Sequence, residues 1–122
     1  MISVQETEIS TIEFSDGTLV PKIPRSIRPD FDDIIHIKWM YEEIREFFVV
    51  AQIVDYFKKS RFAYSKIALI MPFFPYSRQD RLMDNGQAED TPNALKTFCG
   101  MVDNLGLSVV ITVDPHSQAI ES

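Results

Sequence analysis

Cysteine and long hydrophobic runs are both scarce in this chain. Cys99 is the one cysteine, so an internal disulfide is excluded, and its place among apolar residues at helical spacing predicts a buried thiol. No segment has the length of a membrane span, and the first residues lack the basic flank and apolar core of a secretory signal. We therefore expect a cytoplasmic protein that makes no membrane contact.

Basic charge is also in short supply. The 122 residues carry 12 Lys and Arg against 18 Asp and Glu, a formal net charge of −6. Nucleic-acid backbones are bound by clustered Lys and Arg, so a broad nucleic-acid surface is excluded, whereas a small anion bound by a few arginines is not. The length and the 45% hydrophobic content are those of one globular domain with a genuine core.

Two apolar runs predict buried strands. Residues 66–72 and 108–113 do not alternate between apolar and polar residues as a strand with one solvent-exposed face does. Such continuous apolar runs are typical of strands covered on both faces in a parallel sheet. A further short strand is predicted at residues 34–37. Upstream, residues 9–23 form two strand-like runs around Ser15-Asp-Gly-Thr18, which predicts a β-hairpin, and Pro21 and Pro24 favour an edge position for its second arm.

Two helices are predicted between these strands. Residues 41–59 contain no Gly or Pro, and an apolar face recurs at helical spacing in Ile44, Phe47, Val50, Ala51, Val54 and Phe57. Apolar residues on its other faces indicate further cover by a subunit or neighbouring domain: Phe48, Val49, Ile53 and Tyr56. The second helix has Thr91 as predicted N-cap, Pro92 at its first position and Gly106 beyond its end. Its inward face is predicted to be Leu95, Phe98, Cys99, Val102 and Leu105.

Together these elements predict an α/β fold with a parallel, Rossmann-like sheet, right-handed crossovers and an N-terminal β-hairpin. The last predicted strand is followed by a charged loop and no closing helix, so we expect the chain to be truncated before a second domain.

Charged and polar residues follow both apolar runs: Arg78, Gln79, Asp80, Arg81, Asp114 and His116. Open α/β sheets bind ligands beyond the carboxyl ends of their strands, so these side chains are candidates for binding phosphate or metal. A surface salt-bridge cluster is the alternative for the charges at 78–81. Asp114 as a turn cap and His116 as a solvated loop histidine are the alternatives at the second run.

The segment Met71-Pro-Phe-Phe-Pro-Tyr-Ser-Arg-Gln-Asp-Arg81 resembles the P-Y-F-x-Y-A-R-Q-D-R motif of the ribose-phosphate pyrophosphokinases, or phosphoribosyl pyrophosphate synthetases. Phe14-Ser-Asp-Gly17 is similar to the family's hairpin motif F-S-D-G-E, and Asp114-Pro-His116 to its D-L-H or D-P-H motif. Motif order and approximate spacing agree from the hairpin to the end of the chain. The resemblance implies a type I phosphoribosyltransferase-like domain, the N-terminal, ATP-side half of such an enzyme.

The resemblance also implies roles for individual residues. Arg78 and Gln79 would bind ATP with support from Asp80, and Asp114 and His116 would be the Mg²⁺-associated pair, with His116 also catalytic. Phe14 and Asp16 would contact the adenine of ATP bound by a neighbouring subunit, which requires oligomerisation. Phe14 is equally explained as a cross-strand packing partner.

The implied reaction transfers a pyrophosphoryl group from ATP to ribose 5-phosphate, with AMP as the second product. The 122 residues contain neither the family's acidic sugar-phosphate loop nor its flexible catalytic loop, so we expect no activity from the chain alone, and ribose 5-phosphate binding only with a C-terminal domain supplied. Thr18 stands where the family usually has an adenine-contacting Glu. The alternative function is a non-catalytic regulatory or assembly partner of a full-length synthetase.

Overall fold

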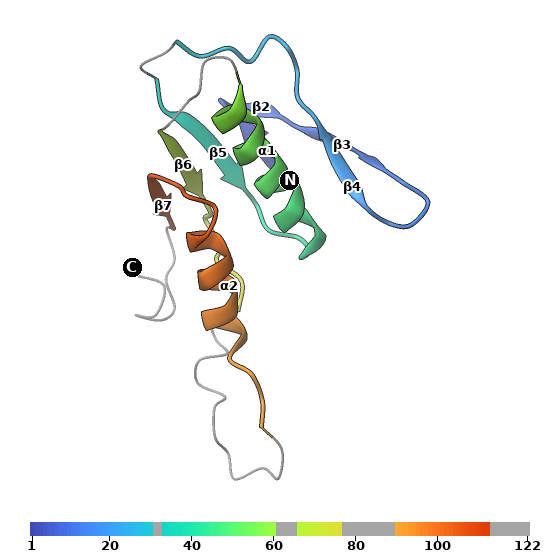
Figure 1. Ribbon diagram of the computed structural model, residues 1–122, viewed down its shortest axis with the longest axis vertical. Coiled ribbons are helices and arrows are strands. Elements are labelled where there is room, and N and C mark those ends of the chain that lie inside the picture. Colours follow the sequence, from blue (N-terminus) through green and yellow to red (C-terminus); the bar gives the residue numbers. More distant parts are fainter. Residues whose placement is uncertain (31–32, 61–65, 77–89, 113–122) are drawn as a thin grey trace.

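The structure, a computed structural model, describes residues 1–30, 33–60, 66–76 and 90–112 (Figure 1). The elements along the chain are β1 Ile2–Val4, β2 Thr7–Glu8, β3 Ser10–Glu13, β4 Leu19–Lys22, β5 Ile35–Trp39, α1 Arg45–Lys59, β6 Ile67–Ile70, α2 Ala94–Asp103 and β7 Val109–Ile111. One sheet has the strand order β2-β1-β5-β6-β7, and β3 with β4 forms a separate two-stranded sheet. The predicted α/β fold class and hairpin are confirmed.

The predicted parallel pairing is confirmed for β5, β6 and β7, and two antiparallel strands that were not predicted extend the sheet, which is therefore mixed. Strands β5, β6 and β7 are parallel neighbours, but β1 pairs antiparallel with β5, placing Ile2 opposite Trp39. Strand β2 then pairs antiparallel with β1. The tight turn between β1 and β2 has Gln5 and Glu6 in the left-handed region, at φ 48° and 66°, where Gly or Asn is the usual signal. The sequence lacked that signal, so neither strand was predicted.

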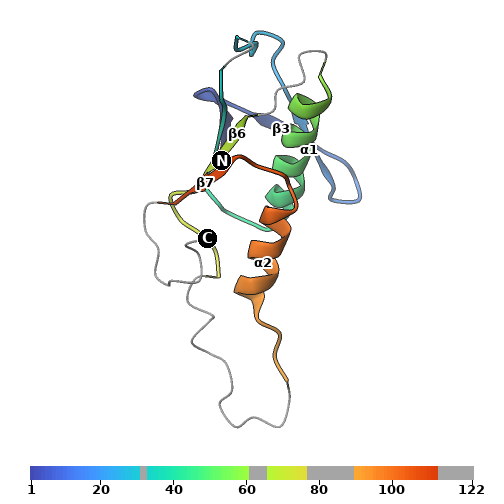
Figure 2. The ribbon, with the colours of Figure 1, turned by 60° about the vertical axis from the view of Figure 1, so that its left-hand side comes forward.

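Both helices lie on one face of the five-stranded sheet (Figure 2). Strands β5, β6 and β7 succeed one another in space as they do in sequence, and crossovers of one hand then place both connecting helices on one side. The core lies between these helices and the sheet, with Ile35, Ile37 and Trp39 of β5 fully buried in it.

The opposite face of the sheet is less covered than predicted. Along β5 buried and exposed residues alternate, with His36 and Lys38 exposed, and all three residues of β7 are exposed. Of the two apolar runs, only the one that forms β6 shows the nearly continuous burial that was predicted for both. The prediction of strands buried on both faces is therefore wrong for β7, because its edge position and the one-sided helical layer leave it open.

Helix α1 begins at Arg45, four residues later than predicted. Its N-cap, Ile44, makes no side-chain cap hydrogen bond and is exposed, so its predicted place on the buried face is wrong. The buried residues are Val49, Val50, Ile53, Val54 and Phe57. Of the side chains predicted to lie on other faces, Phe48 and Tyr56 are exposed as expected, whereas Val49 and Ile53 face the sheet because the buried stripe is wider than the predicted one.

Helix α2 begins at Ala94, and its N-cap is Asn93 rather than the predicted Thr91. The Asn93 side chain accepts a hydrogen bond from the backbone N–H of Lys96, the usual function of an N-cap. The predicted C-terminal signal is confirmed, because Gly106 has φ 72° just beyond the helix. Leu95, Phe98 and Val102 are buried as predicted, whereas Cys99 and Leu105 are only partly buried.

Candidate functional site

The two segments that carry the predicted ATP and metal residues leave the sheet from neighbouring strands. Strands β6 and β7 are parallel and in register, with Ile70 opposite Ile111, and the N–H of Met71 donates to the carbonyl of Ile111 at 2.8 Å. The carboxyl ends of the two strands therefore lie side by side at one edge. The predicted residues themselves lie outside the described part of the chain: Arg78, Gln79, Asp80, Asp114 and His116.

An aromatic cluster lies beside this edge and is centred on Phe98 of α2. The rings of Trp39, Tyr41, Phe47, Phe74 and Tyr76 surround Phe98 with centroid separations of 5.2–6.3 Å. Tyr76 is the last described residue before the Arg78 segment, and its φ of 64° is unusual for a residue with a large side chain. The cluster thus fixes the point from which that segment departs.

Tyr41 and Tyr76 interact through their phenol groups at the rim of the cluster. Burial first, and then hydrogen bonding to Tyr76, raises the pKa of Tyr41 to about 12. Tyr41 therefore keeps its proton at neutral pH. No periodic pattern marks this pair in the sequence, because the two residues are 35 positions apart and both lie outside regular elements.

Oxygen and imidazole groups are the side-chain donors available for a metal ion at this edge of the sheet. Thr112, the first residue after β7, has a buried hydroxyl with no hydrogen-bond partner among the described residues. Within the described ranges no cluster of three or more His, Cys, Asp or Glu is placed to hold a metal. The Asp114 and His116 side chains that follow Thr112 have donor types compatible with Mg²⁺, whose remaining positions are commonly filled by water and substrate phosphates.

The hairpin carries the predicted adenine-contacting residues and exposes both of them. Phe14 has half of its surface exposed, and its backbone closes the turn, donating to Thr18 and accepting from Gly17, both at 2.9 Å. Asp16 accepts hydrogen bonds from the Thr18 hydroxyl at 2.7 Å and the Thr18 N–H at 3.0 Å. These bonds, the hydroxyl first, lower the pKa of Asp16.

Two side chains of α1 connect the helix to this hairpin. The Arg45 guanidinium donates to the carbonyl of Gly17 at 2.7 Å, and the Gln52 amide donates to the carbonyl of Leu19 at 3.0 Å. Neither contact was predicted from the sequence, because hydrogen bonds to backbone carbonyls leave no residue pattern. Arg45 and Gln52, which were not predicted, thus contact the hairpin that carries the predicted Phe14 and Asp16.

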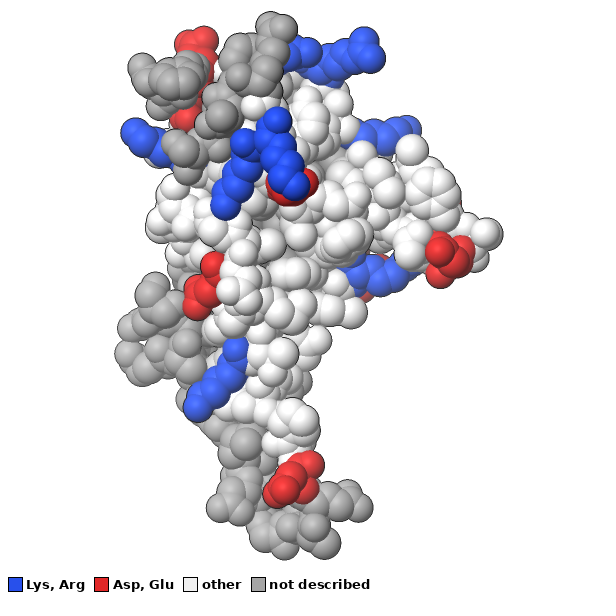
Figure 3. All heavy atoms as spheres, in the orientation of Figure 1, with Lys and Arg blue, Asp and Glu red and all other residues white. Residues whose placement is uncertain are grey.

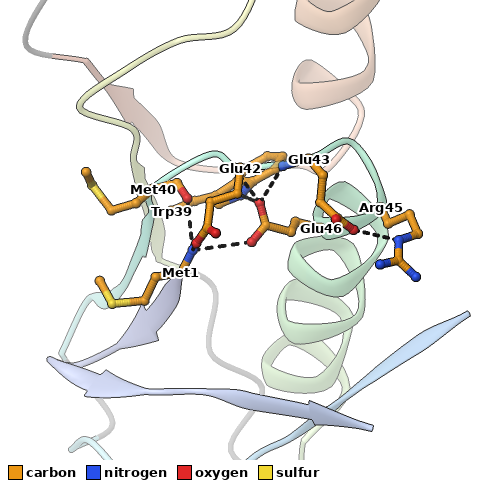
Figure 4. A network of polar contacts seen from close by, with 7 residues as sticks. All are labelled: Met1, Trp39, Met40, Glu42, Glu43, Arg45 and Glu46. Atoms are coloured by element: carbon orange, nitrogen blue, oxygen red, sulfur yellow. Dashed lines mark hydrogen bonds and ion pairs between the residues drawn. The ribbon is translucent and has the colours of Figure 1, made fainter. Parts of the chain in front are cut away.

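A polar network lies where β5 joins α1 (Figure 4). One carboxylate oxygen of Glu46 accepts from the Trp39 indole at 3.1 Å and from the backbone N–H groups of Glu42 and Glu43 at 2.7 and 3.1 Å. The Met1 amino group donates to Met40 and contacts the carboxylates of Glu42 and Glu46. Burial alone would raise the pKa of Glu46, but the hydrogen bonds together lower it.

Charged residues of both signs are spread over the face shown in Figure 3, with uncharged surface between them. Exposed apolar side chains of α1 and the hairpin are Ile12, Phe14, Val20, Ile44, Phe48 and Tyr56. A separate hollow of about 770 Å³ is lined by residues of β1, β5 and β6 together with Gln5, Glu6 and Glu8, and neither Phe14 nor Asp16 borders it.

Comparison with known proteins decides the family. A sequence profile described as the N-terminal domain of ribose phosphate pyrophosphokinase matches residues 1–106. The chain belongs to the ribose-phosphate pyrophosphokinase family. The resemblance noted from the three motifs is thereby confirmed.

Curated ribose-phosphate pyrophosphokinases resemble the chain along nearly all of it. Identity is 24% to the protein of Saccharolobus solfataricus, over 95% of this chain and 38% of that protein. It is 28% to the protein of Bacillus caldolyticus, over 99% and 36% of the two chains. Ribose-phosphate pyrophosphokinase 2 of Saccharomyces cerevisiae is 27% identical over 98% and 36%. The chain therefore spans little more than a third of the length of these ribose-phosphate pyrophosphokinases.

The family match covers the hairpin, both helices and the strand that precedes the Arg78 segment. It ends before β7, so residues 107–122, including Asp114 and His116, lie beyond the profile match and are covered by the pairwise similarities. In the described ranges, no helix combines the length and apolar character required to cross a bilayer.

Proposed function

We propose that this chain supplies the ATP side of a ribose-phosphate pyrophosphokinase. In the proposed reaction the 1-hydroxyl of ribose 5-phosphate attacks the β-phosphorus of ATP, the bond from that phosphorus to the oxygen shared with the α-phosphate breaks, and AMP leaves as the hydroxyl proton is released. The observation that carries the proposal is the alignment of β6 and β7, whose adjacent carboxyl ends precede the two motif segments.

Phosphoryl transfer depends mainly on positioning and charge stabilisation, and the motif residues suit that task. The Arg78 guanidinium offers a fork of donors to phosphate oxygens, Gln79 an orienting amide, and Asp80 support for either. Asp114 and His116 would hold Mg²⁺, which on binding screens the charge of the triphosphate. His116 is also the proposed catalytic residue. The buried Thr112 hydroxyl, which has no partner within the described ranges, supports a polar ligand in this neighbourhood.

The hairpin is proposed to act on a neighbouring subunit. Phe14 offers an exposed aromatic surface to the adenine of ATP bound by another chain, and Asp16 a carboxylate to the same base. Such use requires a homo-oligomer or assembly with another synthetase subunit. The exposed apolar residues of α1, among them Phe48 and Tyr56, support an interface close to the hairpin.

The chain alone is proposed to be inactive. The acidic loop expected to bind ribose 5-phosphate is absent from the 122 residues, and alignment of the two reactants supplies much of the lowering of such a barrier. Residues 1–122 would then be the N-terminal domain, working with a C-terminal half from a longer chain or a separate polypeptide. A coupled assay that detects AMP release by the pure chain would contradict this proposal.

Binding of ATP with Mg²⁺ tests the central proposal. In an isothermal titration we expect Arg78→Ala to weaken ATP binding about 10- to 100-fold, the loss expected for a charge-assisted hydrogen bond to phosphate. Arg25→Ala is the matched control, because Arg25 is exposed and outside the motif segments, and it should leave binding unchanged. Equal binding by the Arg78 variant and the wild type would refute the assigned role.

One observation favours the alternative, a non-catalytic assembly partner. The Asp16 carboxylate oxygen already accepts two hydrogen bonds from Thr18, the residue that replaces the family's usual Glu. A hairpin with an internally bonded carboxylate is less suited to base recognition than one with two free carboxylates. If the chain joins a full-length synthetase from its own source without changing that enzyme's ATP dependence, as measured by light scattering and assay, the alternative is supported.

A further inference from the structure

The β3–β4 hairpin has little support of its own. It is a two-stranded sheet without further strands, and every residue of β3 is exposed. Isolated two-stranded hairpins are at best marginally stable in water. The direction in which this hairpin points is therefore set by its contacts with the rest of the domain, chiefly those between β4 and α1.

Arg45 makes the contact nearest the turn. Its Nη1 donates to the Gly17 carbonyl at 2.7 Å and lies 3.5 Å from the Glu13 carboxylate, so one guanidinium contacts both sides of the turn. The Glu43 carboxylate accepts from Arg45 Nε at 2.5 Å and orients the guanidinium (Figure 4). Gly17 has φ 87°, a conformation that glycine adopts without strain, and its carbonyl is thereby presented to the helix.

A second contact restrains the arm of the hairpin that follows the turn, at its turn-proximal end. Gln52 lies two helical turns beyond Arg45 on α1 and donates to Leu19, the first residue of β4, at 3.0 Å. The two donor residues are roughly 10 Å apart along the helix axis, and their hydrogen bonds restrain two carbonyls near the turn, which a single contact cannot do. Loss of the contact at Arg45 would leave Leu19 held by Gln52 and the turn residues 14–17 without their restraint to α1.

We propose that Arg45 is a positioning residue that fixes the direction in which the hairpin presents Phe14 and Asp16 to a neighbouring subunit; this role deepens the proposed use of the hairpin in ATP binding. Gly17 adjoins Asp16 in sequence, and its N–H donates to the carbonyl of Phe14, so a guanidinium bound to Gly17 acts on both residues through the turn. Arg45 touches neither of their side chains in any contact described above.

If Arg45 only stabilised the fold, its replacement would lower the unfolding midpoint. The ion pairs of Arg45 with Glu13 and Glu43 involve side chains that are all about half exposed, and such pairs contribute little to stability. Replacing Arg45 should therefore change hairpin orientation while leaving the unfolding midpoint nearly unchanged.

Residual dipolar couplings of backbone amides test this without any ligand. In the wild type, the amides of the hairpin and those of α1 should fit one alignment tensor. In Arg45→Met the couplings of the turn residues 14–17 should fall to about half or less, whereas those of α1 persist. Lys59→Met is the matched control, because Lys59 is an exposed cation of the same helix paired with Asp55, and its couplings should equal those of the wild type. Unchanged hairpin couplings in Arg45→Met would overturn the inference.

Titration with ATP and Mg²⁺ under oligomer-forming conditions separates this inference from the proposed function. If wild-type ATP binding shifts the resonances of Phe14 and Asp16, Arg45→Met should reduce the apparent affinity about 5- to 10-fold and Lys59→Met should not. Retained affinity in Arg45→Met would overturn the functional part of the inference. If ATP shifts neither residue in the wild type, the hairpin's proposed use fails, and the dipolar couplings alone decide whether Arg45 fixes the hairpin.

Discussion

Replacement of Phe98 by alanine tests the packing on which the predicted ATP edge depends. Phe98 is 2% exposed and lies within 5.2–6.3 Å of the rings of its aromatic neighbours. Truncating a buried Phe to Ala typically costs about 3–5 kcal/mol, and the loss of several ring contacts at one position favours the upper end. Because native domains are stable by about 5–15 kcal/mol, this is a large fraction of the total free energy of unfolding.

Urea denaturation followed by tryptophan fluorescence measures this change, since the Trp39 ring lies 6.0 Å from that of Phe98. Phe73→Ala is the matched control, because Phe73 is half exposed, and its loss should be within about 0.5 kcal/mol. The Phe98 variant should also weaken ATP binding, since Tyr76 packs on Phe98 directly before the Arg78 segment. A destabilisation below about 1 kcal/mol for Phe98→Ala would refute the central role of this ring.

Three further predictions concern single contacts. Glu46→Ala should cost about 1–3 kcal/mol at pH 7, because the buried Trp39 indole loses its hydrogen-bond acceptor. The pKa of Glu46 is lowered in the folded state, so the stabilisation is present above the ordinary pKa of a glutamate and is lost as the pH falls through the folded-state pKa. The variant and the wild type should therefore converge in stability in urea titrations at acid pH. Gly106→Ala should cost about 1 kcal/mol or more by thermal unfolding, because φ is 72° and the added Cβ meets Lys58; no loss would contradict the assigned backbone conformation. The raised pKa of Tyr41 predicts that stability falls as pH rises from 10 to about 12, and that this fall is smaller in Tyr41→Phe.

The sequence predicted the elements whose signals are local. The apolar runs located β6 and β7, Gly106 marked the end of α2, and the Asp-Gly pair at 16–17 located the hairpin turn. The first strands were missed because a short run such as Ile2–Val4 carries no periodicity and the following turn uses Gln5 and Glu6. The N-cap of α2 was placed two residues early because Thr91-Pro92 imitates the usual start signal while Asn93 makes the bond.

Some residues at the predicted site follow from sequence motifs, whereas others become apparent only from three-dimensional packing. Phe14 and Asp16 were predicted from the hairpin motif and are exposed, and their contact with adenine stays a prediction. Arg45 and Tyr41 were not identified, because their partners, the Gly17 carbonyl and Tyr76, lie far away in sequence. Burial of β7 was overestimated because an apolar run indicates strand but does not reveal whether a second layer covers it.

The most direct test of the account is whether one ATP–metal complex contacts both motif segments. Mn²⁺ in place of Mg²⁺ broadens amide resonances near the ion, so a spectrum recorded with ATP and Mn²⁺ reports on residues 78–81 and 114–116 together. If one ATP–metal complex lies between the two segments, both should broaden when ATP and Mn²⁺ are present, and Arg78→Ala should abolish the effect at both. Broadening of one segment only, or broadening that does not require ATP, would contradict it.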